Sequence, residues 1–222
     1  MDWLAPVDAY CERTGPEYWA EPVNALTNAA FVLAALIMAW RLRGSGLALA
    51  WAMVAVLALI GLGSFLFHTH ANRLTGLMDV LPILTFILLY IFAATRDVLG
   101  ARSWLAGLAV LAFLPYAALT VPLFRMVPVL GVSAGYLPVP LLIVIYAVLL
   151  WPRAPATARG MTAGAGLLLV SLFFRSIDEA VCDAFPLGTH FLWHILNAAM
   201  LGWMIEVYRR HMAARAAGRP TG

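Results

Sequence analysis

The sequence predicts an all-α integral membrane protein, a seven-transmembrane helix bundle that forms one domain over residues 1–222. Of its 222 residues, 64% are hydrophobic and 11% are charged, and the mean hydropathy is +0.89. These values lie far outside the range of soluble globular domains. Apolar windows of about 20 residues, the length that spans a bilayer core, recur along the whole chain. No internal repeat or linker suggests a second domain.

Seven windows have the length and apolar character of a membrane span. They cover residues 24–41, 46–67, 74–95, 103–122, 128–151, 161–182 and 190–209. The region from Pro115 to Pro140 is the hardest to divide, because prolines at five positions interrupt its helical pattern. A count of six or eight spans would have to arise there.

The arginines predict the orientation of the bundle. All fourteen basic residues are arginine; with seven spans, ten lie in the first, third and fifth connections and the tail, three lie on the other side, and Arg175 lies inside the sixth span. The ten are Arg41, Arg43, Arg96, Arg102, Arg153, Arg159, Arg209, Arg210, Arg215 and Arg219, and the three are Arg13, Arg73 and Arg125. Because cytoplasmic loops collect basic residues, we expect residues 1–23 outside and the tail 210–222 in the cytoplasm. We interpret these arginines as topology determinants and expect no nucleic-acid partner. Residues 1–23 lack the pattern of a cleavable signal peptide, so we expect them to remain in the mature protein.

Three histidines at the outer ends of these windows predict a zinc hydrolase. His190 and His194 are spaced i, i+4, which places both rings on one helical face, and His68 ends the second window. Three neutral imidazoles are a ligand set of catalytic zinc, which makes a nucleophile from water at neutral pH. We expect Asp79 to act as general base on that water and Ser64 to donate a hydrogen bond to the oxyanion. Such a site would hydrolyse an amide or an ester.

Several of these polar residues have a structural interpretation as well. Single histidines at helix ends are usually interface residues, and we expect this of His70 and His211. Ser64 follows a Gly-rich stretch that also permits close helix packing. Asp178 could pair with Arg175, hydrogen-bond a histidine ligand, or make a purely structural polar contact.

The N-terminal segment offers a second group of polar residues. Asp8, Glu12 and Glu21, with Asn24 at the start of the first window, present hard oxygen ligands that suit calcium. Acidic residues before a helix also complement its dipole, which is the alternative interpretation. Two cysteines, Cys11 and Cys182, are both expected on the outer side, where they form either a disulfide or two buried thiols.

Four blocks of sequence carry a resemblance to a known family. They are Asp8-Ala9-Tyr10-Cys11-Glu12 with Trp19-Ala20-Glu21 and Asn24, then Gly63-Ser64-Phe65-Leu66-Phe67-His68, then Leu77-Met78-Asp79-Val80-Leu81-Pro82, and finally Ile177-Asp178 with Cys182 and Gly188 to His194. In this order and approximate spacing, they resemble the alkaline ceramidases, within the seven-helix membrane hydrolases that include the adiponectin and progestin receptors.

The resemblance implies hydrolysis of the amide of ceramide to a sphingoid base and a fatty acid. It implies zinc on the three histidines, Asp79 orienting the water, Ser64 stabilising the oxyanion, and it favours the calcium site and an intramolecular Cys11–Cys182 bridge. The sequence departs from the family pattern at the calcium segment. The stretch between Glu12 and Glu21 is shorter than in the family, and Asp8 lies one residue earlier relative to Cys11. Thr14 stands where Asn is usual.

Two other functions fit the same residues. One is a zinc hydrolase of another lipid amide or ester, and the other is a seven-helix receptor-like protein with structural zinc. A retinal protein is excluded because a chain without lysine cannot form the Schiff base. The Arg-, Ala- and Gly-rich composition suggests a GC-rich bacterial genome. In that case the membrane is the bacterial inner membrane, and the site faces the periplasm. Trp3, Trp19 and Trp193 are expected near that boundary, as anchors or ordinary aromatic-belt residues.

Overall fold

A computed structural model describes residues 2–128 and 130–218 of the chain, so that Arg219, counted above with the cytoplasmic arginines, lies outside the described residues. The described residues form helices joined by turns, and they contain no strand. The α-helices are α1 (Pro22–Thr27), α2 (Ala29–Arg41), α3 (Ala48–His70), α4 (Arg73–Ala93), α5 (Ser103–Arg125), α6 (Pro138–Leu150), α7 (Pro155–Ile177) and α8 (His190–Ala216).

Five segments are long and apolar enough to cross a membrane. They are Pro22–Arg41, Ala48–His70, Arg73–Val98, Ser103–Arg125 and Pro155–Ile177. The helix α6 is apolar but has only 13 residues, and α8 is not among the five. The chain is therefore all-helical with the character of a multi-pass membrane protein, and the count of seven spans remains a prediction.

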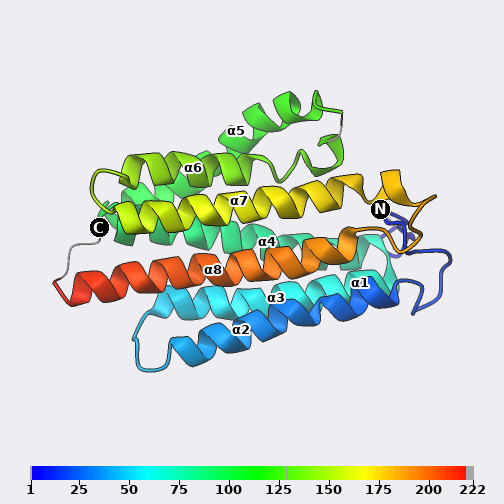
Figure 1. Cartoon of the computed structure of the whole chain (residues 1–222), viewed down its shortest axis with the longest axis horizontal. Helices are drawn as coiled ribbons and strands as arrows, with labels where there is room; N and C mark the ends of the chain where they lie inside the picture. Colours follow the sequence, from blue (N-terminus) through cyan, green and yellow to red (C-terminus); the bar gives the residue numbers. More distant parts are fainter. Residues whose placement is uncertain (1, 129, 219–222) are drawn as a thin grey trace.

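The helices run side by side along the long axis of the molecule (Figure 1). Helix α8 packs between α7 and α2, and α3 packs against both α2 and α4. The end of α3 and the start of α8 lie at the end of the bundle that holds the N-terminus, which we call the histidine end. The opposite end, where α8 finishes at Ala216, is called the arginine end.

Prolines account for the main differences from the expected helix limits. The expected span 128–151 is wrong at its start, because α6 begins only at Pro138, in the first turn of the helix. The expected span 161–182 is displaced, since α7 begins at Pro155 for the same reason and ends at Ile177. The first span divides into α1 and α2 at Asn28.

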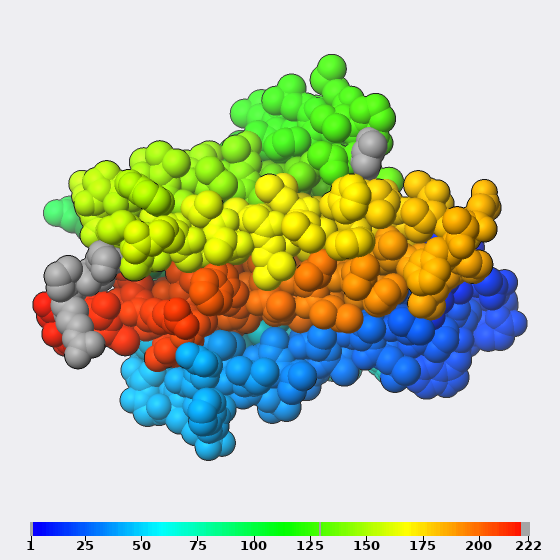
Figure 2. Space-filling view, viewed as in Figure 1, coloured from blue at the N-terminus to red at the C-terminus, as the bar shows by residue number. Residues whose placement is uncertain are grey.

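Helix α5 is the least covered of the helices. It exposes large apolar side chains along most of its length, and Figure 2 shows the later part of α5, in green, standing out from the rest of the bundle. At the other extreme, α3 and α4 are in very close contact beside the histidine end. A Cβ atom on Gly63 would overlap the backbone carbonyl of Met78, so only glycine permits this approach. The contact brings neighbouring Ser64 and Asp79 together.

Candidate metal centre

Three buried histidines converge at the histidine end of the bundle. His68 belongs to the last turn of α3, and His190 and His194 belong to the first two turns of α8. One possible ligand atom of each lies within 4.8 Å of the other two, and none of the three residues is more than 2% exposed. Among the described residues, this is the only group of three or more possible ligands that could hold a metal ion.

Each of these rings keeps one nitrogen without a partner. His68 Nε2, His190 Nδ1 and His194 Nε2 are buried and make no hydrogen bond within the described part of the chain. A buried polar atom without a partner is costly, so three such atoms at one place indicate a group that receives their lone pairs. Three imidazole nitrogens are a donor set that zinc prefers. The residues therefore fit the metal that the sequence predicts.

The second nitrogens of two rings are held by neighbouring side chains. The Glu21 carboxylate lies 2.6 Å from His68 Nδ1, and the Thr27 hydroxyl lies 2.9 Å from His194 Nδ1. Such partners orient the rings of metal-binding histidines and select their tautomers. Sequence reasoning placed Glu21 in a calcium site and did not select Thr27. No sequence signal joins Glu21 to a histidine 47 positions away.

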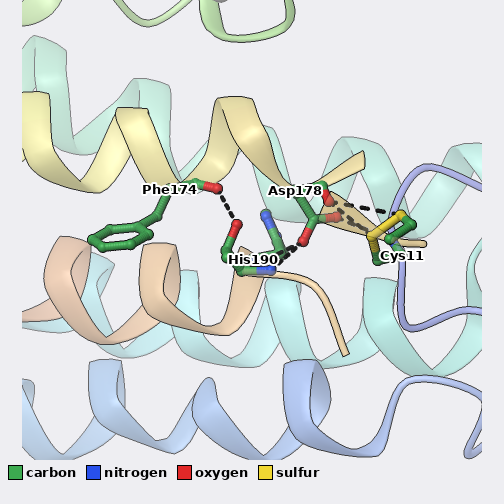
Figure 3. The surroundings of a disulfide bond; sticks show 6 residues. Cys11, Phe174, Asp178 and His190 are labelled. Carbon is green, nitrogen blue, oxygen red and sulfur yellow. Dashed lines mark hydrogen bonds between the residues drawn. A yellow bond between two sulfur atoms is a disulfide. The ribbon is translucent and has the colours of Figure 1, made fainter. Parts of the chain in front are cut away.

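Asp178 holds the start of α8 in place (Figure 3). Its Oδ1 accepts hydrogen bonds from the backbone N–H groups of Thr189, at 2.6 Å, and of His190, at 2.8 Å. Its Oδ2 accepts a third from the backbone N–H of Cys11, at 3.0 Å. The N–H groups of Thr189 and His190 are donors that a helix terminus otherwise leaves unsatisfied. Of the alternatives open to Asp178, the structural contact is therefore observed, and it fixes the backbone of a candidate histidine ligand rather than its ring.

A disulfide lies directly beside this carboxylate. Cys11 and Cys182 are joined, with Cα atoms 5.4 Å apart, which fits the expected intramolecular bridge and corrects the alternative of two separate thiols. Gly188 completes the corner with a φ of +65°. A Cβ atom on this glycine would overlap both Asp178 Oδ1 and Cys11 Cβ, so the chain requires glycine here.

The two candidate catalytic residues lie on the α3–α4 contact. Ser64 is buried on α3, and its side chain interacts with the carboxylate of Asp79 on α4. The same carboxylate is close enough to His68 and Arg175 to interact electrostatically with both. The other two histidines stay apart from this site: His70 is exposed, and His211 hydrogen-bonds Thr157 at 2.9 Å near the arginine end.

The three residues expected to bind calcium do not form a shared ligand set. Asp8 is exposed. The two Glu12 oxygens accept hydrogen bonds from the backbone N–H groups of Val23 and Asn24, both at 2.7 Å. Burial nevertheless raises the pKa of Glu12, because these two bonds offset it only in part. The Glu12 carboxylate therefore serves the start of α1.

Glu21, the third of these residues, is also fully engaged by the protein. One oxygen pairs with Arg13, and the other lies next to His68 and accepts from the Asn24 amide at 3.1 Å. Burial alone would raise the pKa of Glu21, but the contacts with His68 and Arg13 outweigh burial and hold this pKa below its usual value. These residues, as arranged, do not fit a calcium ion.

Aromatic residues connect the histidines to an apolar cavity. The Tyr10 ring stacks on His190 with centroids 3.6 Å apart, and burial raises the pKa of Tyr10. Arg175 lies over the rings of Tyr136, at 5.2 Å, and Trp193, at 5.9 Å, and both rings line the cavity. The expectation that Trp193 lies in an interfacial belt is wrong, because it is 5% exposed and points into the bundle, whereas Trp3 and Trp19 are exposed.

Comparison with known proteins agrees with these observations. The family model described as Ceramidase matches residues 8–219, nearly the whole chain. No curated protein matches the chain.

Proposed function

The chain belongs to the ceramidase family, and we propose that it hydrolyses the amide bond of ceramide at a zinc ion held by His68, His190 and His194. Membership of the family supports a membrane hydrolase, and the site supports the chemistry. The observation that carries the proposal is the set of three buried ring nitrogens without partners, beside a carboxylate on the neighbouring helix.

The residues around the histidines have separate roles in the proposed reaction. Zinc held by the three histidines would supply an acidified water and a positive charge for the carbonyl oxygen of the substrate. The Asp79 carboxylate takes a proton from the attacking water and returns it to the nitrogen that leaves as the C–N bond breaks. The Ser64 hydroxyl donates a hydrogen bond to the charge that develops on the carbonyl oxygen as the new C–O bond forms. The products are a carboxylic acid, which then ionises in water, and an amine.

The apolar cavity supports a lipid substrate. It lies between α4, α6, α7 and α8, and its lining includes Phe86, Met161 and Trp193. Trp193 lies between the two α8 histidines in sequence, so one wall of the cavity belongs to the helix that carries two of the candidate ligands. An alkyl chain in this cavity would place its amide near the polar residues, since apolar surfaces with a few polar groups at one end are typical of lipid sites.

The proposed topology places the site at the periplasmic face of a bacterial inner membrane. Seven crossings follow if α6 and α8 also span, which their packing along α7 supports. Arg41, Arg96 and Arg209 gather at the end opposite the histidines, as expected of a cytoplasmic face. With this orientation the amide of an outer-leaflet lipid reaches the site without leaving the membrane.

The proposal is tested with detergent-purified protein and a long-chain ceramide, with and without a zinc chelator. We expect about one zinc per chain, and release of fatty acid and sphingoid base, read by mass spectrometry, that the chelator abolishes and added zinc restores. His194→Ala should lose both zinc and turnover, whereas the matched His211→Ala should keep them. Bound zinc without release from ceramide or any other lipid amide or ester would favour a structural role for the metal.

A further inference from the structure

An arginine is buried next to the metal centre in a segment that contains no helix. Arg13 is 9% exposed, and its guanidinium makes three different contacts. Its Nε pairs with Glu21 Oε1, its Nη1 donates to the backbone carbonyl of Gly15 at 3.0 Å, and its Nη2 donates to the backbone carbonyl of His68 at 2.9 Å. A buried cation is tolerated only where partners such as these compensate for its lost hydration.

These contacts reach one histidine by two routes. Arg13 holds the His68 backbone directly through its carbonyl. It also holds the His68 ring through Glu21, whose second oxygen lies against Nδ1 of that ring. The remaining ring nitrogen, Nε2, is the atom left without a partner in the cluster. One side chain therefore restrains both the backbone and the ring of a candidate ligand.

We propose that Arg13 is the resident cation beside the Glu21 carboxylate and a positioning residue for His68. The guanidinium occupies the place next to Glu21 where a calcium ion was expected, and it keeps the Glu21 carboxylate directed at the His68 ring. The claim about His68 rests on the proposed function, whereas the claim about the cation does not.

The occupancy of the carboxylate oxygens supports this assignment. Both Glu12 oxygens accept backbone N–H groups, and both Glu21 oxygens face protein donors. Calcium takes six to eight oxygen ligands, and carboxylates usually supply several of them. In this chain a calcium ion would have to displace Arg13 and would leave that guanidinium buried without its carboxylate.

The test compares Arg13→Met with Arg73→Met, an exposed arginine at the same end of the bundle. Both proteins are loaded with zinc and dialysed against a graded chelator, without any lipid. Loss of an outer partner of a metal ligand typically weakens metal binding about 10–100-fold. Arg13→Met should therefore release zinc at a chelator concentration lower than that for the wild type by about the same factor. Arg73→Met should match the wild type, and Arg13→Lys should recover part of the loss because it restores the charge. Zinc retention by Arg13→Met equal to the wild type would overturn the positioning role.

A second measurement tests the cation by itself. The melting temperature of each protein is measured with millimolar calcium and with a calcium chelator. The wild type should not respond, whereas Arg13→Met, with Glu21 Oε1 freed, should be stabilised by calcium. A wild type that binds one calcium per chain, or an Arg13→Met protein indifferent to calcium, would overturn the resident-cation claim. A wild type without zinc would count against the proposed function and leave this second measurement valid.

Discussion

The two ends of the bundle both bury ionisable side chains, but they do so differently. At the arginine end, Glu206 accepts hydrogen bonds from Arg41, Arg209 and Arg210. At the histidine end, by contrast, the most buried rings each keep a free nitrogen. Complete hydrogen-bond pairing is typical of a structural network, whereas buried polar atoms without a partner indicate a ligand-binding site.

The ends also differ in the number of side-chain partners that each buried group has. Glu206 has three cationic partners, all partly exposed, so each contact is replaceable and screened by solvent. The rings of His68 and His194 each have one outer partner, Glu21 and Thr27. Single changes should therefore affect function strongly at the histidine end and stability modestly at the arginine end.

The largest effects are expected from the site residues themselves. Asp79→Asn should keep zinc and lose turnover about 10²–10⁴-fold, the usual contribution of a general base. His190→Ala should lose both zinc and turnover, because a ligand is removed. Metal content and ceramide turnover are measured on the same samples. Full activity of Asp79→Asn would show that the general-base assignment is wrong.

A smaller effect is expected from the bridge that braces the histidine end. The disulfide joins residues 171 positions apart, and bridges of this kind contribute about 2–4 kcal/mol. Cys182→Ser should lower the melting temperature, and the reduced wild type should migrate differently from the oxidised protein on a non-reducing gel. Identical mobility, with both cysteines open to alkylation, would contradict the bridge. Ala184→Ser, a nearby change that leaves both cysteines in place, is the control.

The smallest effect is expected at the arginine end. Glu206→Gln removes a carboxylate shared by three arginines and should lower stability by about 1–2 kcal/mol, since the partners are solvated. Turnover per folded molecule should stay the same. Arg210→Gln should have less effect, because Glu206 keeps two partners. A loss of turnover comparable to that of Asp79→Asn would show that the two ends are coupled.

Local patterns predicted much of this protein. Hydropathy marked the positions of the helices because burial in lipid requires long apolar windows. The His190–His194 pair was predicted because helical spacing alone places both rings on one face. Prolines made the start of α6 uncertain, since they both interrupt helices and begin them.

Contacts between distant segments could only come from the tertiary structure. Glu21 meets His68, Asp178 meets Cys11, and Trp193 turns into the cavity rather than toward the interface. Arg13 counted only as a loop arginine in the sequence, yet it fills the space beside Glu21. The sequence by itself determined the helices and the histidine pair, because these depend on neighbours along the chain. The tertiary structure decided which side chain each buried charge would meet, because that partner depends on how the helices pack.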